Sequence, residues 1–186
     1  MLIEEAFTPF PVLTTERLIL RQVVPADAPA LFAVKGDRAI TRAYAQPPHP
    51  SAEITRSWIE RLGQSFQRRE ALFWGLAMID GGPLIGTGGF WNIDAGSACA
   101  ELGYELGRDF QGQGLMSEAV RAMLDYGFGR MGLHRVEALP LEENSSSIRL
   151  LERLGFRQEG HLRQRIFFDG RRIDQRMYSL LAGEWR

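Results

Sequence analysis

The pattern of hydrophobic and polar positions in the first part of the chain predicts a strand, a short helix and a longer helix. Residues 17–24 are rich in β-forming residues and predict the strand, and the apolar positions at 31–34, after helix-start signals, predict the short helix. Prolines interrupt residues 41–50 and predict a loop. After the N-cap signal of Ser51, apolar residues recur at intervals of three and four over residues 54–66, which is typical of an amphipathic helix facing a sheet.

Three strand-like runs then follow without a helix between them. Residues 71–79 and 84–91 flank the turn signal Asp-Gly-Gly-Pro at residues 80–83, which predicts a hairpin. Residues 99–106 form the third run. Parallel neighbours would need a crossover connection, so consecutive strands of this kind predict an antiparallel meander.

A glycine-rich turn after the meander leads into alternating helices and strands. The pattern predicts a helix from residue 115 to near residues 129–132, a strand at 134–139, a helix at 144–154, and strands at 156–168 and 171–181. The strand at 134–139 is expected to lie parallel to the strand before the helix, by a right-handed crossover. This order predicts an α+β fold around a mixed sheet, in a single domain over residues 1–186 with residues 1–14 as an extended N-terminal segment.

Composition limits the class of protein. A chain of 186 residues with 45% hydrophobic and 24% charged residues is ordinary for one globular domain. The formal net charge of −1 lacks the basic excess of a nucleic-acid binder, and no apolar run is long enough to cross a membrane. The single cysteine, Cys99, excludes an internal disulfide and a cysteine-based zinc site. Since no signal-peptide pattern is present either, we expect a cytoplasmic protein without nucleic-acid or membrane partners.

The glycine-rich turn carries the strongest chemical signal. Gly112 and Gly114 leave no Cβ between backbone and ligand, and the helix that follows offers unpaired N–H groups at its positive end. The turn therefore predicts an anion site for coenzyme A, a dinucleotide or a nucleoside triphosphate. A P-loop needs a lysine in the turn, and the only lysine is Lys35, so kinase and NTPase functions are excluded. Ser117 and Glu137 nearly complete a dinucleotide fingerprint, but the chain holds too few βαβ units for a doubly wound sheet.

Several sequence blocks in a fixed order carry a family resemblance over nearly the whole chain. The blocks are Thr-Glu-Arg-Leu-Ile-Leu-Arg at 15–21, Glu-Leu-Gly-Tyr-Glu-Leu at 101–106, Gln-Gly-Gln-Gly-Leu-Met-Ser-Glu-Ala at 111–119, Asn-x-x-Ser at 144–147 and Leu-Gly-Phe at 154–156. With these blocks the sequence resembles a GNAT acetyltransferase, and specifically the branch that acetylates ribosomal-protein N-termini. The resemblance implies a mixed, mostly antiparallel central sheet of about seven strands with helices on both faces.

The same resemblance implies the reaction. Acetyl-CoA is the implied donor, no metal takes part, and the acceptor is a primary amine that attacks directly in a ternary complex. A protein N-terminal α-amino group, such as that of a ribosomal protein, is the favoured acceptor. A small-molecule amine, such as a polyamine or an antibiotic, stays open as an alternative, and so do a non-catalytic acyl-CoA-binding module and a homodimer.

The resemblance places the cofactor on the strand at 99–106 and on the glycine turn. The strand's free backbone groups would hold the pantetheine arm, and the amides of the turn would hold the pyrophosphate. The implied cofactor-binding residues are Tyr104, Leu106, Arg108, Gln111, Gly112, Gln113, Gly114, Leu115, Met116 and Asn144. Asp109 departs from the family, where Gln or Arg is frequent, so the adjacent Arg108 is expected to help with phosphate. Asn144 fits a bond to the cofactor arm, and a helix N-cap role fits it equally.

Amine acetylation needs a base for the nitrogen and a proton for the leaving thiolate. By strand position, Glu101 and Glu105 lie nearest to the acetyl group; regular alternation puts both on one face, and a bulge would break this parity. We favour Glu101 as the base, with a solvated or ion-paired carboxylate as the structural alternative. The usual acid, a tyrosine, is absent because Leu151 stands at its position. Ser147 is therefore the candidate for the thiol contact, although helix capping would also explain a serine there.

The acceptor is expected to be selected by loops, in particular residues 41–50 and 167–173. Trp91, at the end of a meander strand, is the tryptophan expected to border the acceptor. His161, next to Glu159, is a second candidate for this border. Isolated histidines are more often surface or core residues, so no histidine is assigned a catalytic role.

Overall fold

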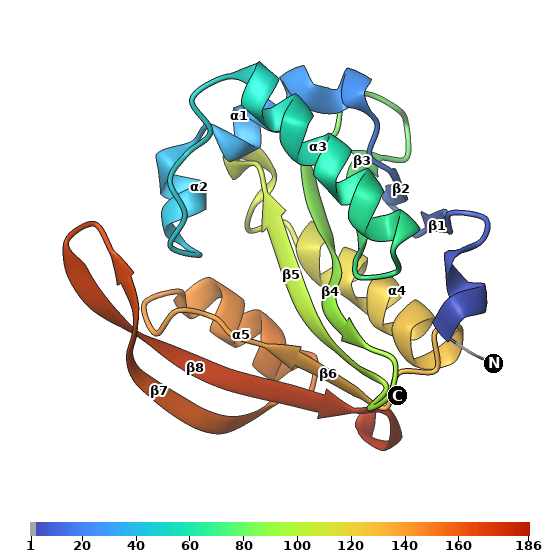
Figure 1. The fold of residues 1–186 in the computed structure, drawn as a ribbon, viewed down its shortest axis with the longest axis vertical. Coiled ribbons are helices and arrows are strands. Elements are labelled where there is room, and N and C mark those ends of the chain that lie inside the picture. The colour runs from blue at the N-terminus through green and yellow to red at the C-terminus, as the bar shows by residue number, and fades with distance from the viewer. Residues whose placement is uncertain (1–2) are drawn as a thin grey trace.

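The computed structural model describes residues 3–186, which form one eight-stranded sheet with helices packed on it (Figure 1). The strand order across the sheet is β1-β2-β3-β4-β5-β6-β8-β7. The strands are β1 (Leu13–Thr14), β2 (Leu18–Gln22), β3 (Leu72–Met78), β4 (Gly86–Asp94), β5 (Cys99–Leu106), β6 (Arg135–Ala138), β7 (Arg157–Phe168) and β8 (Arg171–Leu181). The helices are α1 (Ala28–Lys35), α2 (Arg38–Arg42), α3 (Ala52–Gln67), α4 (Leu115–Gly129) and α5 (Ser145–Arg153), with 3₁₀ turns at Ile3–Phe7, Pro25–Asp27, Arg108–Phe110 and Ala182–Glu184.

Strands β3 to β5 form the predicted antiparallel meander, and β2 pairs antiparallel with β3 on its other side. The chain then passes through α4 into β6, which runs parallel to β5. Strand β8 pairs antiparallel with β6, and β7 pairs antiparallel with β8 at the edge of the sheet. The prediction of a mixed, mostly antiparallel sheet is confirmed, with eight strands in place of about seven.

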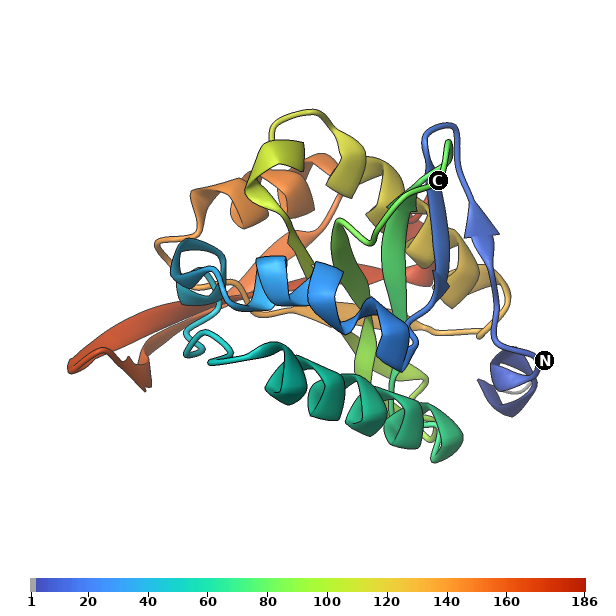
Figure 2. The same cartoon turned by 90° about the horizontal axis from the view of Figure 1, so that it is seen from above.

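The helices cover both faces of the sheet, as predicted. Figure 2 shows α1 and α3 on one side of the sheet and α4 and α5 on the other. Trp74, Phe90 and Met123 are fully buried, and the Trp74 ring meets Phe90 and Tyr126 edge to face. Full burial of one such apolar side chain stabilises the fold by about 1.5–3 kcal/mol. This packing fixes α4, the helix that begins at the glycine turn, against the sheet.

The N-terminal segment differs from the extended one predicted for residues 1–14. Residues 1 and 2 lie outside the described part of the chain, Ile3–Phe7 form a 3₁₀ turn, and β1 adds the eighth strand by pairing with β2. Phe7 is buried against Phe66 of α3, and the Ala6 carbonyl accepts a hydrogen bond from the Tyr126 hydroxyl at 2.5 Å. These partners are distant in sequence, so the local pattern could not indicate them.

Helix α2 is a second difference, because prolines predicted a loop from residue 41. The helix runs two residues into that range, to Arg42, and the loop follows it. Asp37 caps the helix by accepting a hydrogen bond from the Ala39 N–H at 2.7 Å, and Ile40 is buried. This helix and loop form one wall of the cleft that holds the candidate site.

Candidate active site

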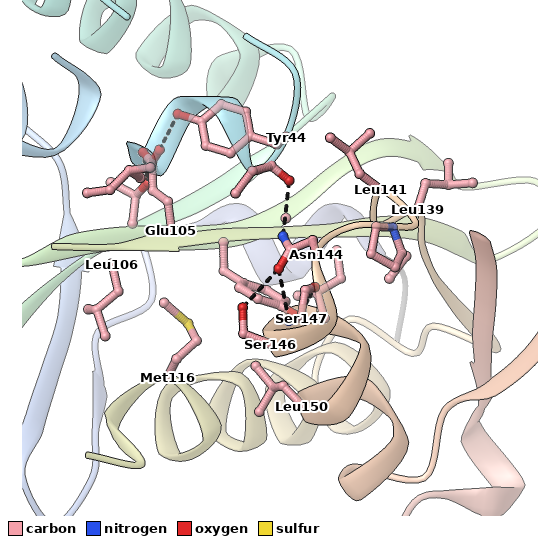
Figure 3. A pocket seen from close by; sticks show the side chains of 18 of the residues that line it. Tyr44, Glu105, Leu106, Met116, Leu139, Leu141, Asn144, Ser146, Ser147 and Leu150 are labelled. Carbon is pink, nitrogen blue, oxygen red and sulfur yellow. Dashed lines mark hydrogen bonds between the residues drawn. The ribbon is translucent and has the colours of Figure 1, made fainter. Parts of the chain in front are cut away.

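A cleft opens where β5 and β6 separate. The two strands pair only at residues 99–101 of β5 with residues 135–137 of β6, and among the described residues the rest of β5 has no strand partner on that side. The cleft, about 1120 Å³ in volume, is lined by β5, the glycine turn, the start of α4, α5 and the α1–α2 region. Figure 3 shows side chains from these walls around it. The resemblance implied free backbone groups on this strand, and the separation of β5 from β6 leaves β5 with no strand partner from residues 3–186 on this side beyond residue 101.

The glycine turn has the backbone geometry of an anion cradle. Gly112 and Gly114 have φ angles of +74° and +80°, in the left-handed region that other residues rarely adopt. A Cβ at Gly112 would meet no atom within 4 Å, so the space beside it is open to a ligand. No side chain caps α4 at Gly114, which leaves N–H groups of the first helical turn available. The chain's own residues thus fit a pyrophosphate at the positive end of the helix.

Contacts from the N-terminal part of the chain hold this turn in place. Arg17 donates to the carbonyl of Gln113 at 3.0 Å and pairs with Glu118 of α4 at 2.7 Å. The Thr15 hydroxyl and the Arg17 backbone N–H donate to the same carboxylate at 2.5 and 2.8 Å. Burial alone would raise the pKa of Glu118, but these hydrogen bonds together lower it. The block at residues 15–21 therefore supports the turn.

Most of the residues predicted to bind the cofactor come together at the cleft. Those that line it are Tyr104, Leu106, Gln111, Gly112, Gly114, Leu115, Met116 and Asn144. Arg108 and Gln113 do not line it. Gln111 and Gln113 turn their amide groups to the protein itself, where they donate to the carbonyls of Leu106 at 2.8 Å and Asp109 at 2.7 Å. These two side chains therefore shape the turn rather than face outward.

Glu105 is enclosed by donors from three other elements. Its oxygens accept from Lys35 at 2.7 Å, from the Tyr44 hydroxyl at 2.6 Å and from the Thr87 hydroxyl at 2.9 Å, and the residue is 8% exposed. The Lys35 ammonium also lies 4.1 Å from the centre of the Trp58 ring. Figure 3 shows the bond between Tyr44 and Glu105. Glu105 and Lys35 thus form a structural ion pair that joins β5 to α1.

Glu101 lies on the same face of β5. Pairing with β4 is regular over residues 101–106, so no bulge breaks the alternation within this part of β5. A bulge lies instead in β4, between Trp91 and Asp94. There Asn92 has a φ of +46° and donates a hydrogen bond to Glu101 at 3.2 Å. The irregularity thus directs an amide at the carboxylate that we favour as the base.

Compared with water, the surroundings of Glu101 in the protein favour the protonated form of its carboxyl group. Burial raises the pKa of its carboxyl, and the negative charge of Glu137 adds to this effect. The hydrogen bond from Asn92 and the positive charge of Arg165 act in the opposite direction, and the net pKa is raised. A carboxylate with a raised pKa is a better proton acceptor at neutral pH.

On the opposite face of β5, Tyr104 meets α5. Its hydroxyl lies 2.8 Å from the hydroxyl of Ser147. Burial raises the pKa of Tyr104 to about 12, so this hydroxyl is protonated at neutral pH. Leu151 is fully buried in the core and does not line the cleft. Helix α5 offers the hydroxyls of Ser146 and Ser147 to the cleft, and Ser147 is the one that meets Tyr104.

Asn144 is the N-cap of α5 and also bridges two walls of the cleft. Its Oδ1 accepts from the Ser147 N–H at 3.1 Å and from the Ser146 hydroxyl at 2.9 Å. Its Nδ2 donates to the carbonyl of Ala43, just after α2, at 3.0 Å (Figure 3). The capping role that the sequence left open is present, and a bond from Asn144 to the cofactor arm stays a prediction.

Sequence reasoning missed Lys35, Tyr44 and Asn92, which surround the two strand carboxylates. Tyr44 lies in a segment predicted as loop, and its partner Glu105 is 61 residues away in sequence. Asn92 reaches Glu101 only because of the bulge. Lys35 is the only lysine of the chain, and this was the one signal that could have singled it out.

The walls of the cleft suit an extended ligand with a phosphate group at one end. A ligand with its pyrophosphate on the glycine turn and an amide-bearing arm along the free edge of β5 directs its other end toward the start of that strand, where Glu101 lies. Within residues 3–186, no three His, Cys, Asp or Glu side chains gather to hold a metal ion, and no helix is long and apolar enough to cross a membrane. The fold and the site define an acyl-CoA-dependent N-acyltransferase.

Comparison with known proteins gives the same class. The family model described as an acetyltransferase (GNAT) domain matches residues 17–157. The chain is 37% identical to the uncharacterized N-acetyltransferase YoaA of Bacillus subtilis (strain 168), covering 92% of this chain and 97% of the relative. It is 33% identical to the ribosomal protein uS5-alanine N-acetyltransferase of Escherichia coli (strain K12), covering 93% and 92%. The chain belongs to the GNAT family of acetyltransferases.

A solved structure of a family member shows a similar fold with a ligand. This is RimL, a ribosomal L7/L12 α-N-protein acetyltransferase in complex with coenzyme A. The TM-score is 0.79 at 27% identity, and the match covers 92% of this chain and 97% of RimL. The predictions of the family, of an enzyme and of acetyl-CoA as its donor are confirmed.

Proposed function

We propose that this N-acetyltransferase acetylates the N-terminal α-amino group of a protein, with a ribosomal protein as the favoured acceptor. The observation that carries the proposal is that one cleft holds Glu101 on one face of β5 and the Tyr104–Ser147 pair on the other. The relatives named for ribosomal proteins uS5 and L7/L12 support a protein acceptor. A cytoplasmic location fits such an acceptor.

The chain supplies two positions for proton transfer. Acetyl-CoA supplies the acetyl thioester. The Glu101 carboxylate takes a proton from the amine nitrogen, directly or through water, and the freed lone pair attacks the carbonyl carbon. As the N–C bond forms and the C–S bond breaks, the Ser147 hydroxyl donates a hydrogen bond to the departing sulfur. The nitrogen loses its second proton to water as the amide forms, Glu101 passes its proton to water, and the sulfur takes one proton from water, so that one proton is released overall.

Glu105 takes no part in these reaction steps. Its oxygens are held by Lys35, Tyr44 and Thr87, so a proton there would displace an ion pair or a hydrogen bond. Its place in the proposal is structural, because it joins β5 to α1 and to the segment after α2. This leaves Glu101 as the base on this face of the strand.

An acceptor panel with release of free CoA as the readout tests the proposal. The panel contains lysine-free peptides with a free N-terminus, the same peptides with a blocked N-terminus, a polyamine and an aminoglycoside. We expect CoA release only with the free peptides, and mass spectrometry should place one acetyl group on the α-amino nitrogen. Turnover confined to the polyamine or the aminoglycoside would contradict a protein acceptor. Binding of acetyl-CoA without turnover with any amine would favour a non-catalytic acyl-CoA-binding module.

A further inference from the structure

The hairpin of β7 and β8 carries an irregularity beside the cleft. Strand pairing is regular from Gly160 to Leu162 and resumes at Ile166, so residues 163–165 of β7 stand opposite a single residue of β8, Asp174. Gln164 has a φ of +53°, which is rare for a residue with a side chain. Bulges of this kind redirect the side chains next to them and often lie beside active sites.

Asp174 holds the bulge in one conformation. Its Oδ1 accepts a hydrogen bond from the backbone N–H of Gln164 at 2.7 Å, and its Oδ2 lies 2.7 Å from Nε2 of His161. The bond from Gln164 and the contact with His161 lower the pKa of Asp174, which keeps it ionised at neutral pH. The hollow beside the bulge, about 750 Å³ in volume, is lined by His161, Leu162, Arg163, Gln164, Arg165 and Asp174.

The two cations of this hollow, Arg163 and Arg165, have no ion-pair partner among the described side chains. Three other arginines of the hairpin are paired: Arg157 with Glu184 at 3.0 Å, Arg176 with Glu142 at 2.5 Å, and Arg171 with Glu143. Two guanidinium groups on one bulge repel each other, and an anion bound by both would be stabilised by both. Asp174 is the one carboxylate among the residues that line the hollow, and its charge acts on Arg163, so the two guanidinium groups leave the hollow with a net positive charge.

The hollow adjoins the acetyl-transfer cleft. Ile166, next to the bulge, lines that cleft, and the charge of Arg165 acts on Glu101. The hairpin tip is tied to α2 by the pair of Arg38 and Asp169 at 2.9 Å. Figure 1 shows the tip of the hairpin near α2. The two arginines therefore lie on the hairpin that forms one side of the cleft.

We infer that Arg163 and Arg165 form a subsite for a carboxylate of the acceptor, so that the enzyme prefers peptides with an acidic side chain close behind the α-amino group. This inference rests on the proposed function, since it names the class of N-terminus. Guanidinium groups bind carboxylates through paired, charge-assisted hydrogen bonds. The same charges disfavour polycationic acceptors, because a second ammonium group would lie beside them.

The reach of an extended peptide sets the design of the test. Such a peptide advances about 3.3 Å per residue, so side chains at its second to fourth positions lie within about 13 Å of the reacting nitrogen. The panel consists of peptides of one length with a single Glu, Gln or Lys at position two, three or four. A C-terminal amide on every peptide removes the other carboxylate that the subsite could bind. The value of kcat/KM is measured for each peptide by CoA release.

The wild-type enzyme should favour Glu over Lys by about tenfold at the best position, the effect of one charge-assisted contact. The double variant Arg163→Gln/Arg165→Gln should reduce this ratio to less than about twofold, and each single variant should remove part of it. Arg165→Lys keeps the charge but not the paired hydrogen bonds, so it should remove less of the ratio than Arg165→Gln. The matched control is Arg157→Gln, on the same strand but paired with Glu184. It should keep the full ratio.

Each outcome of this test supports or overturns the subsite. Equal kcat/KM for Glu and Lys peptides, or a preference that survives in the double variant, would overturn the subsite while leaving the proposed function intact. Loss of the preference in Arg157→Gln would also overturn it, because the effect would then be one of general surface charge. Absence of CoA release from every peptide would contradict the proposed function itself and, with it, the subsite.

Discussion

The two ends of strand β5 each carry a carboxylate on the same face, and the surroundings of the two differ. Toward the C-terminal end, Glu105 is 8% exposed and is held by Lys35 and two hydroxyl groups. Toward the N-terminal end, where β5 leaves β6, Glu101 is half-buried and accepts a hydrogen bond from Asn92. Glu105 is held by an ion pair, whereas no lysine or arginine of residues 3–186 forms an ion pair with Glu101.

The difference shows that depth of burial does not decide what a carboxylate does. Glu105 is the more deeply buried of the two, but a lysine and two hydroxyls replace the water that it lost. Glu101 lost water without gaining a salt bridge, so burial raises its pKa. We infer that the C-terminal end of β5 and the adjoining turn position the donor, and that the N-terminal end moves the proton.

The largest expected effect comes from breaking the donor end at the glycine turn. Gly114→Val forces a β-branched residue to a φ of +80° and moves the first N–H groups of α4 away from the pyrophosphate. Loss of two charge-assisted hydrogen bonds would weaken acetyl-CoA binding by about 3–6 kcal/mol. Calorimetry measures this affinity, and circular dichroism checks that the fold is intact. An unchanged dissociation constant would show that the turn does not hold the donor.

Glu105→Gln tests the fixed carboxylate. It leaves the Lys35 ammonium buried without its counter-charge, so the free energy of unfolding should fall by about 3–5 kcal/mol, as measured by urea denaturation. The double variant Glu105→Leu/Lys35→Met should lose less than this, because no charge remains unpaired. If Glu105→Gln were as stable as the wild type, the ion pair would have no structural role.

A smaller effect is expected from the contacts of Glu118 with Arg17 and Thr15, which hold the glycine turn in place. Glu118→Gln weakens the contacts with Arg17 and Thr15, which should lower the free energy of unfolding by about 1.5–3 kcal/mol at neutral pH. The folded state lowers the pKa of Glu118 from its ordinary value of 4.5, so this contribution is present above that value and is lost as the pH falls below it. The stability gap between the two proteins should therefore close in acid. A stability difference that stays constant with pH would exclude these contacts of Glu118 as its source.

The smallest effects concern the pKa of Glu101, at the N-terminal end of β5. Arg165 lowers the pKa of Glu101 and Glu137 raises it. Arg165→Gln should therefore move the acidic limb of the kcat profile to higher pH, and Glu137→Gln should move it to lower pH. Shifts of the same sign in both variants would show that the limb does not report Glu101.

The sequence predicted the elements of the donor end well because their signals are local. The bounds predicted for β5, residues 99–106, are those observed, and Gly112 and Gly114 marked the turn by their freedom to adopt positive φ. Alternation also placed Glu101 and Glu105 on one face correctly. It could not distinguish them, because their partners come from other elements.

The missed parts depend on contacts between distant segments. Lys35 reaches Glu105 only after α1 has packed beside the meander, and Asn92 reaches Glu101 only through the bulge in β4. The N-terminal 3₁₀ turn is held by Phe66 and Tyr126, far along the chain. The bulge at residues 163–165 is likewise fixed by a side chain of the next strand. Local patterns carry no information on such pairs.

The pH dependence of turnover in Glu101→Gln tests the central claim most directly. The kcat of the wild type, Glu101→Gln and Glu105→Gln is measured with saturating acetyl-CoA and peptide from about pH 6 to about pH 9, a range that spans the ordinary pKa of an α-amino group. We predict that Glu101→Gln lowers kcat by about 100-fold at the acidic end, where the amine needs a base, and by less as the pH rises. Glu105→Gln should show no such trend. Equal kcat for the wild type and Glu101→Gln at every pH would contradict the account.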